Sequence, residues 1–571
     1  MAGTLVAVAG VISIVVVAAL SRRVGVAAPL ALVLVGTALG FLPGAPTVEL
    51  APHWVITIIL PPLLYAAAVQ MPAIDFRRDL KAIGGLAFLL VAVTTLGTGY
   101  LFAWLLPGLG LAAAFALGAV VSPTDAVAAT SIGRRLGLPS RLLTILEGEG
   151  LVNDASALVL LASATAAMTS TVHLGQIGLE FVWAVVAATV IGVLVGAVTV
   201  RIRGRLNDAV LTTAMSFVVP FLAFLPAEEL GASGVLAVVV CGLVNGDQSP
   251  RYLRATDRIA ESVNWRTVAF LLESGLFLVM GLQLHTLIDQ CEAAGLSVAW
   301  AVGIGLAASL LAIATRILFV VPLVSMMRHD AARAASLGTR LQEVRDRIAA
   351  ADMENRAPRR TQRFQQRLTR MEGDIAFVLA ENLGWRGAAV LAWSGMRGAI
   401  TVAAAQTLPA GTPYRPQLLL IAFVVALTTL LLQGLTLPKV IQVLRVPADD
   451  AAADRADYAT LLGEIQAQTQ GFLDHPTRPD GTSYPQDVVD RVRSYWVRIP
   501  PAASDDPPPP SDARDPHELY RELSADYLRA QQTELLNIRA TGAYNSRILS
   551  QAQHTLDSAL AQLQQADDAA H

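Results

Sequence analysis

Apolar residues dominate the first 445 positions of the chain in long runs, which polar segments separate. Thirteen of these runs are long enough, or nearly so, to cross a hydrocarbon core about 30 Å thick. Their approximate limits are 4–20, 28–42, 54–69, 83–105, 110–132, 142–168, 181–200, 208–225, 232–245, 268–284, 296–324, 388–408 and 417–437. We therefore predict an all-α polytopic membrane protein with about thirteen transmembrane helices.

The basic residues between these runs support the same count. Connections after even-numbered runs contain one basic residue, Arg415, whereas those after odd-numbered runs carry clusters. The clusters comprise Arg22, Arg23, Arg77, Arg78, Lys81, Arg134, Arg135, Arg141, Arg201, Arg203, Arg205, Arg251, Arg254, Arg258 and Arg266, and then a long arginine-rich insert. Because basic loops stay in the cytoplasm, we expect a plasma (inner) membrane protein with its N-terminus outside and its C-terminus in the cytoplasm. The first run lacks the positive n-region of a signal peptide, so we interpret it as a retained span.

The composition also indicates a membrane protein. Of the 571 residues, 54% are hydrophobic and 15% are charged, whereas soluble domains contain about 25% charged residues. The net charge of −3 is no argument for a nucleic-acid partner, and the two cysteines, Cys241 and Cys291, form no metal-binding spacing. We expect contact with the lipid bilayer, no nucleic acid and no cofactor.

Two segments lie outside the predicted membrane domain of residues 1–445. Residues 328–386 join the eleventh and twelfth runs, and heptad-like stretches on both sides of Pro358 predict a cytoplasmic helical hairpin. Residues 446–571 form a predicted cytoplasmic tail with helical stretches around a proline-rich linker near 499–516, which we expect to be extended. A spacer or an interaction surface is the simplest role for both segments, and regulation is the alternative.

Few charged residues remain inside the predicted spans. A charge at the bilayer centre costs about 2.5–3.5 kcal/mol on insertion scales, so it is usually paired or functional. The charged residues at membrane depth are Asp125, Glu149, Asp154, Glu273, Arg316 and Arg397. Each of them is therefore a candidate site residue.

Helical geometry assigns different tasks to the acidic residues. Asp154 lies thirteen residues after Arg141, about 20 Å along a helix, and Asp125 of the preceding antiparallel span reaches a similar depth. We expect these two carboxylates to face one another. Glu149 points about 140° away from Asp154 and shares a face with Asn153. The two acidic residues therefore have different tasks: one can serve an ion while the other pairs with an arginine.

Two spans contain helix-breaking residues. Ser-Pro-Thr occupies 122–124 in the fifth run, and Ser-Gly-Met-Arg-Gly occupies 394–398 in the twelfth. Proline removes a helical N–H and glycine loosens the helix, so we predict interruptions whose carbonyls and half-helix ends can bind cations. The two interrupted spans, the fifth and the twelfth, are seven spans apart. This separation is expected if two inverted six-helix repeats follow an offset first helix. Arg397 would balance the C-terminal dipoles of the half-helices.

These features favour a secondary transporter for a small cation over an enzyme. A carboxylate that binds either a proton or a cation, but not both, couples the exchange of the two. An intramembrane aspartyl protease that uses Asp125 and Asp154 is one rival, but it explains neither the arginines nor the broken helices. A sensor whose membrane part is only an anchor is another, and it leaves the buried charges unexplained. Potassium is the alternative to sodium, because the sequence does not determine the size of the cavity.

Five motifs resemble the sodium/proton antiporters of the exchanger family, of the NhaP type. They are LPPLLYAAAVQMP at 60–72, SPTDAVA at 122–128, EGEGLVNDASALV at 147–159, ESGLFLVMGL at 273–282 and GMRGAI at 395–400. They occur in family order across most of residues 1–445. The resemblance implies a moving core, a scaffold that forms a homodimer, and exchange of sodium or lithium for protons in pH and sodium homeostasis.

The resemblance also implies roles for single residues. Asp154 would bind the cation or the proton, and Asn153 would hold the local structure. Asp125, together with the backbone and hydroxyl of Thr124, would complete the site from the broken fifth span. An Asn-Asp pair, where electrogenic relatives carry two aspartates, implies electroneutral one-for-one exchange.

The other charged residues match further positions of the family. Glu149 matches a glutamate that pairs with an arginine of the eleventh span, here Arg316. Glu273 and Arg397 match other polar positions of the core.

Two positions depart from the family pattern. Some members carry a serine directly after the glutamate, where this chain has Gly150. Others carry a glutamate after the aromatic residue of the third span, where Tyr65 is followed by Ala66. Both changes remove oxygen from the surroundings of the cation, so water or backbone would substitute.

Overall fold

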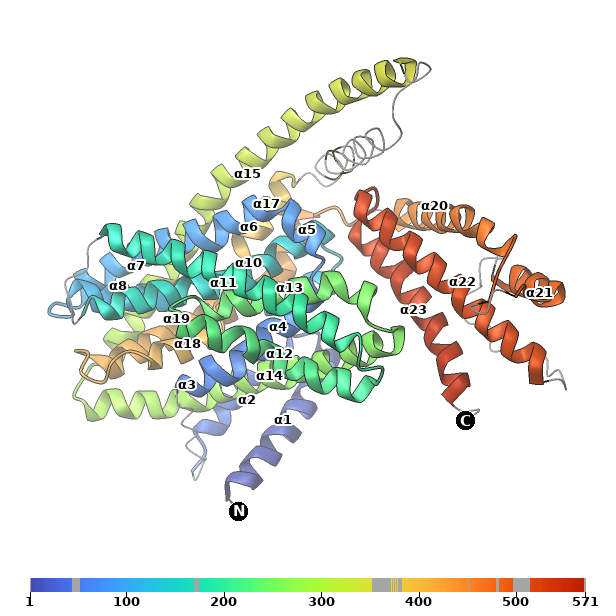
Figure 1. The fold of residues 1–571 in the computed structure, drawn as a ribbon. Coiled ribbons are helices and arrows are strands. Elements are labelled where there is room, and N and C mark those ends of the chain that lie inside the picture. Colours follow the sequence, from blue (N-terminus) through green and yellow to red (C-terminus); the bar gives the residue numbers. More distant parts are fainter. Residues whose placement is uncertain are drawn as a thin grey trace.

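The structure is a computed structural model of the 571-residue chain. It describes residues 2–43, 52–168, 174–351, 383–449, 451–478, 482–496 and 514–568, together with Met371, Gly373, Ile375 and Phe377. Regular elements in these residues are helices, and the β-structure among them is an isolated bridge between Thr477 and Ser483. The helices form one large bundle with a smaller helical unit, made by the C-terminal tail, at one end of it (Figure 1).

The helices follow in one series along the chain. The bundle contains α1 (Ala2–Val24), α2 (Ala28–Gly40), α3 (Pro52–Trp54), the π-helix η1 (Val55–Ile59), α4 (Leu60–Gln70), α5 (Ala73–Arg78), α6 (Leu80–Gly84), the π-helix η2 (Gly85–Leu90), α7 (Val91–Leu105), α8 (Leu111–Val121), α9 (Val127–Arg135), α10 (Ser140–Ala166), α11 (Leu174–Arg203), α12 (Ala209–Glu229), α13 (Gly234–Tyr252), α14 (Ala255–Ala293), α15 (Val298–Ala351), α17 (Trp385–Trp393), α18 (Ala399–Gln406) and α19 (Arg415–Leu444). The tail contains α20 (Ala451–Thr469), the 3₁₀-helix η3 (Gln470–Leu473), α21 (Gln486–Trp496), α22 (Arg514–Thr541) and α23 (Ser546–Asp568).

Each apolar run predicted from the sequence coincides with a helix or with a pair of half-helices. Six described segments are long and apolar enough to cross a membrane by length and composition. They are Leu80–Leu105, Gly178–Arg203, Ala209–Glu229, Ala255–Ala293, Val298–Ser336 and Arg415–Leu444. The helix that carries Asp154, α10, is not among them, because its polar residues lower its mean hydropathy. The all-α membrane fold is confirmed, whereas the number of thirteen spans stays a prediction.

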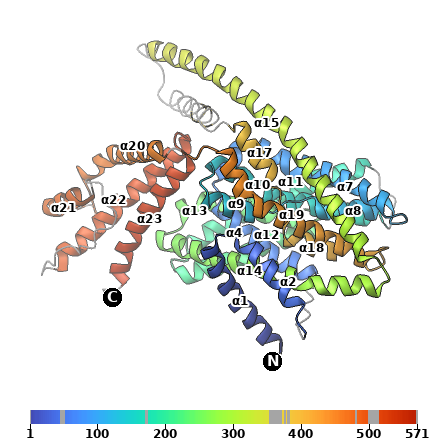
Figure 2. The same ribbon diagram turned by 180° about the vertical axis from the view of Figure 1, so that it is seen from behind.

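Two helices extend well beyond the runs that predicted them. α14 begins at Ala255 rather than near residue 268, so the expected loop arginines Arg258 and Arg266 are helical. α15 continues without interruption to Ala351 and projects out of the bundle (Figure 2). The first part of the predicted 328–386 hairpin is thus a continuation of a membrane helix. Its turn and most of its second part lie outside the described residues.

α2 and α14 pack with their backbones in contact. A Cβ atom at Gly36 would lie 2.3 Å from the carbonyl oxygen of Leu278, and one at Gly281 would lie 2.4 Å from that of Val33. Small residues at such positions permit the close van der Waals packing that associates helices in lipid. This contact holds α14 firmly in the bundle, and α14 carries Glu273.

The C-terminal tail rests on the end of the bundle at which α14 begins. The guanidinium of Arg258 donates to both carboxylate oxygens of Asp557 in α23, with Nε 3.0 Å from Oδ2. Arg78 of α5 donates from Nη2 to the carbonyl oxygen of Gly542, 2.9 Å away. Ala255 is buried in the apolar cluster formed by α20, α22 and α23. The proline-rich linker near 499–516 lies mostly outside the described residues, so its conformation stays a prediction.

The pair between Arg258 and Asp557 is expected to hold the tail in place. The two side chains are 9% and 5% exposed, and disrupting a buried ion pair costs about 3–5 kcal/mol. Arg258→Asp should therefore accelerate backbone hydrogen exchange in α23 at least about tenfold, as measured by mass spectrometry of the full-length protein. The double reversal, Arg258→Asp with Asp557→Arg, should restore slow exchange. Arg529→Asp is the matched control, since the pair of Arg529 with Asp526 is exposed; unchanged exchange in Arg258→Asp would contradict the prediction.

Candidate functional site

Two interrupted helices cross in the middle of the bundle. The chain leaves helical geometry between α8 and α9 and again between α17 and α18, as segments 122–124 and 394–398 predicted. Where the non-helical segments meet, the backbone N–H of Asp125 donates to the carbonyl oxygen of Met396, 2.7 Å away. Lipid offers no hydrogen-bond partner to backbone N–H and C=O groups outside a helix. The two segments therefore supply hydrogen-bond partners for each other's backbone. The interruption of both helices is confirmed.

Arg397 neutralises backbone carbonyls beside the crossing. Its Nε donates to the carbonyl oxygen of Val121, the last residue of α8, at 3.2 Å, and its Nη1 donates to that of Gly395 at 2.7 Å. Its backbone N–H donates to the hydroxyl of Thr429 in α19 at 3.1 Å. The side chain is buried, so a cation placed against a half-helix C-terminus is stabilised by the helix dipole.

Asp125 is held tightly at the crossing. Its Oδ1 accepts a hydrogen bond of 2.8 Å from the backbone N–H of Val127, the first residue of α9. A Cβ atom at Gly398 would lie 2.2 Å from Oδ2 of Asp125 and 2.7 Å from its Cβ. The absence of a side chain at residue 398 therefore provides the space that this carboxylate occupies.

Asp125 and Asp154 line the same cavity, which has a volume of about 340 Å³. Helices α4 and α14 form one part of its wall, and the interrupted segments, α9, α10 and α18 form the rest. Asp154 is 7% exposed, and no hydrogen bond or ion pair reaches its carboxylate from the part of the chain that the structure describes. Thr124 and Glu273 line the cavity as well. The structure thus brings together the two carboxylates that the sequence placed at similar depth.

Glu149 lies in a separate hydrogen-bonded group behind the cavity. Both carboxylate oxygens accept from the guanidinium of Arg316, with Oε2 2.8 Å from Nη2. The hydroxyl of Thr124 donates to Oε1 at 2.6 Å, and Asn153 donates from Nδ2 to the carbonyl oxygen of Thr124 at 2.7 Å. Arg316 also donates to the carbonyl oxygen of Leu391 in α17 at 3.1 Å. The pair of Glu149 and Arg316 therefore connects α10 to both interrupted helices. Its negative and positive charges cancel.

The two departures from the family pattern both lie on the cavity wall. Gly150 and Ala66 are among its lining residues. A Cβ atom at Gly150 would lie 3.0 Å from the Cβ of Ala126, which is tighter than ordinary van der Waals contact. Glycine at residue 150 thus allows α10 to approach the interrupted segment closely, and a serine there would require Ala126 to shift.

An exposed ion pair lies on the same wall. Nη2 of Arg134 at the end of α9 is 2.5 Å from Oε1 of Glu147, and both residues line the cavity. Arg134 belongs to a basic cluster for which the sequence predicts a cytoplasmic position, so the pair marks the end of the cavity on that predicted side. The sequence offered no signal for this pairing.

Two further ion pairs in the bundle are buried, and no pattern in the sequence predicted them. Arg203 was expected to be a solvated loop residue, but its side chain is 0% exposed and its Nη2 lies 2.6 Å from Oε2 of Glu261. Arg203 lies in a basic run that is typical of a solvated loop, so nothing in the sequence indicated that its side chain is buried. Arg141 donates from Nε and Nη2 to Oδ1 of Asp79, at 2.9 and 2.7 Å. Burial raises the pKa of Asp79 more than the hydrogen bonds from Arg141 lower it.

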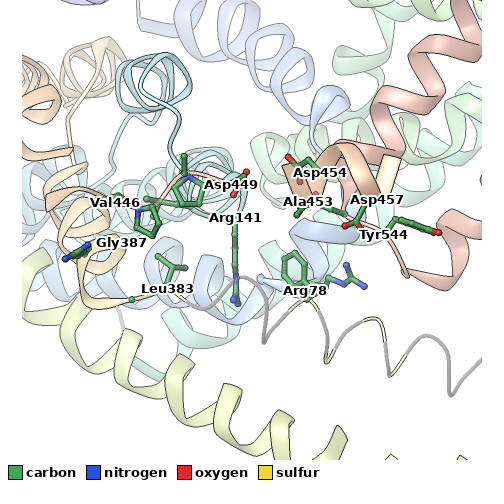
Figure 3. A pocket seen from close by; sticks show the side chains of 18 of the residues that line it. Arg78, Arg141, Leu383, Gly387, Val446, Asp449, Ala453, Asp454, Asp457 and Tyr544 are labelled. Carbon is green, nitrogen blue, oxygen red and sulfur yellow. The ribbon is translucent and has the colours of Figure 1, made fainter. Parts of the chain in front are cut away.

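A larger cavity of about 770 Å³ lies apart from the candidate site residues, between the tail and the bundle. Arg78 and Arg141 line it from the bundle, and Asp454 and Asp457 line it from α20 (Figure 3). None of the candidate site residues takes part in its wall. Because basic side chains line it from the bundle and acidic ones from the tail, this cavity suits a polar contact between the tail and the bundle.

The family model for the transmembrane sodium/hydrogen exchanger matches residues 11–443. The chain belongs to the sodium/hydrogen exchanger family. An uncharacterised Na⁺/H⁺ exchanger of Mycobacterium tuberculosis is 29% identical over 99% of this exchanger and 97% of its own length. A low-affinity Na⁺/H⁺ antiporter of Synechocystis is 28% identical over 81% of this chain and 78% of its own. A sodium, potassium, lithium and rubidium/H⁺ antiporter of Bacillus subtilis is 33% identical over 46% of this chain and 40% of its own.

A solved structure shares the fold. The sodium proton antiporter MjNhaP1 of Methanocaldococcus jannaschii, determined at pH 8, superposes with a TM-score of 0.55. The match covers 78% of this exchanger and 99% of that chain at 16% identity. The resemblance to NhaP-type antiporters inferred from the five motifs is therefore confirmed.

Gly398→Ala is expected to disturb the crossing. The added methyl group would overlap Asp125, and overpacking of this kind costs about 1–3 kcal/mol. We expect a lower thermal unfolding midpoint of the purified exchanger, measured by scanning fluorimetry in detergent, together with loss of function. Gly275→Ala is the control, since a Cβ atom there meets nothing within 4 Å; equal midpoints for the two variants would refute the packing argument.

The pair between Glu149 and Arg316 is expected to act as a unit. Removing one charge leaves the other buried without compensation, which costs about 3–5 kcal/mol. Glu149→Gln and Arg316→Gln should each lower the unfolding midpoint, and the double variant should be less destabilised than the sum of the two. Purely additive effects in the same fluorimetric assay would contradict this coupling.

Proposed function

We propose that this exchanger carries sodium or lithium in one direction and protons in the other, one for one, across the plasma (inner) membrane. The observation that carries the proposal is the pair of carboxylates, Asp125 and Asp154, facing one cavity at the crossing of two interrupted helices. Membership of the sodium/hydrogen exchanger family supports the cation and proton as substrates.

Competition at Asp154 is the proposed coupling step. A carboxylate with little exposure and no protein partner among the described residues is costly unless a proton or a cation neutralises it. The two ligands exclude one another because both require the same oxygen lone pairs. Asp125 is the proposed second ligand, since Oδ1 is engaged by Val127 while Oδ2 accepts no hydrogen bond from the described residues.

The surrounding polar groups support an electroneutral cycle. Glu149 and Arg316 cancel one another, so their charges add nothing to the cavity. Asn153 donates through Nδ2 to Thr124, and its buried Oδ1 has no hydrogen-bond partner in the described chain. An amide at residue 153 supplies a dipole and no second titrating carboxylate beside Asp154. We therefore propose that Asn153 braces the site and that Thr124 contributes an oxygen to the cation.

Potassium is the second candidate cation. The Bacillus subtilis relative is named as a sodium, potassium, lithium and rubidium/H⁺ antiporter, and Gly150 and Ala66 leave the cavity wall without side-chain oxygens at two positions. An aspartyl protease is not favoured, since the family consists of transporters.

The setting of this activity is also proposed. The basic clusters favour an external N-terminus and a cytoplasmic tail. Exchange in this orientation would serve pH and sodium homeostasis. A homodimer is proposed from the family resemblance.

Everted membrane vesicles test the transport step. Sodium or lithium, added to vesicles with a preformed acid interior, should collapse the pH gradient reported by a fluorescent amine dye. Asp154→Asn should reduce the rate at least about a hundredfold, because an amide neither ionises nor exchanges a proton at this site. Parallel assays with potassium decide the cation.

Asp289→Asn is the matched control, because Asp289 lies on α14 with a side chain that is 60% exposed. Wild-type rates in Asp154→Asn, with the protein present at normal levels, would exclude the mechanism.

A further inference from the structure

Three glutamates of the bundle differ in how their charge is balanced. Glu149 is paired with Arg316, and Glu261 is paired with Arg203. Glu273, in the middle of α14, receives no hydrogen bond or ion pair from the residues that the structure describes. A carboxylate among apolar helices is costly without a partner. Glu273 therefore needs a neutralising ligand that none of the described residues supplies.

The position of Glu273 points to the cavity as the source of that ligand. Ala269, Glu273, Leu276 and Phe277 occupy one face of α14, and all four line the cavity shared by Asp125 and Asp154. Glu273 is half-buried, and it lines the cavity together with Asp125. The carboxylate thus faces the same enclosed space from a different helix.

The cavity carries an excess of negative charge. Its lining holds four acidic residues, Asp125, Glu147, Asp154 and Glu273, against one basic residue, Arg134. Because Arg134 is paired with Glu147, three carboxylates remain without a basic partner in the lining. Such an excess in a low-dielectric surrounding attracts and concentrates cations.

We propose that Glu273 is an affinity-determining residue, which supplies a third carboxylate to the monovalent cation in the cavity. The inference rests on the proposed exchange at Asp154 and extends it. Asp125 and Asp154 reach the cation from the interrupted segment and from α10, whereas Glu273 reaches it from α14, which packs against α2 and α4. Ala66 of α4 lines the same cavity with no side-chain oxygen, so α14 provides the carboxylate that this part of the wall otherwise lacks.

Loss of this charge should weaken cation binding and leave the exchange step intact. A unit charge a few ångströms from the cation, partly screened by water, changes affinity on the order of tenfold. In vesicles at one fixed pH, Glu273→Gln should raise the apparent KM for sodium about tenfold and change the maximal rate by less than about twofold. Glu273→Asp, which keeps the carboxylate, should recover most of the affinity.

Glu292→Gln is the matched control, because Glu292 lies on the same helix and is exposed. It should leave both KM and the maximal rate unchanged. A wild-type KM in Glu273→Gln would overturn the inference. So would loss of transport in both Glu273→Gln and Glu273→Asp when both proteins are folded, because that result assigns Glu273 an obligatory or structural role.

A binding measurement separates this inference from the proposed function. Sodium that binds the folded exchanger raises its unfolding midpoint in detergent in proportion to the logarithm of concentration above Kd. Glu273→Gln should need about tenfold more sodium than wild type for the same shift in midpoint. If wild-type vesicles show no exchange, the proposed function fails, and this titration still decides whether Glu273 contributes to cation binding.

Discussion

Two stretches of chain without helical hydrogen bonds meet inside a bundle that excludes water, and each must satisfy the backbone groups of the other. The hydrogen bond from Asp125 to Met396 and the contact of Arg397 with the end of α8 meet this requirement. Gly398 makes the approach possible, because a side chain there would occupy the place of the Asp125 carboxylate. The position of the candidate cation ligand is thus a consequence of how two broken helices avoid exposing their backbone to lipid.

Around this crossing the charged groups separate into two kinds. Glu149 and Arg316 neutralise one another and tie α10 to α17, while Thr124 and Asn153 extend the same hydrogen-bonded group. Asp125, Asp154 and Glu273 instead face a cavity. A paired charge holds two helices together. An unpaired charge in an enclosed space is costly until a ligand neutralises it. The proposed exchange needs both kinds, because the site must hold a cation and also release it.

The tail is connected to the same helices at the end of the bundle. The backbone N–H of Ser140, the first residue of α10, donates to Oδ2 of Asp449, 3.1 Å away, in the segment between α19 and α20. α14 likewise carries Glu273 in its middle and binds the tail through Arg258 near its start. Rigid helices therefore link the end of the bundle that contacts the tail to the cavity of Asp125 and Asp154. The cavity beside the tail and the cavity of Asp125 and Asp154 share no lining residue.

The sequence by itself determined the fold class, the interrupted helices and the separate directions of Glu149 and Asp154. These follow from hydropathy, from the backbone chemistry of Pro123 and Gly398, and from the pitch of a helix, all of which are local properties. Only the tertiary structure decided which buried charges are paired. Arg203 and Glu261 are 58 residues apart, and Glu149 and Arg316 are 167 apart. No local pattern distinguishes a glutamate that meets an arginine from one, Glu273, that faces a cavity, because that difference depends on which distant helix packs beside it.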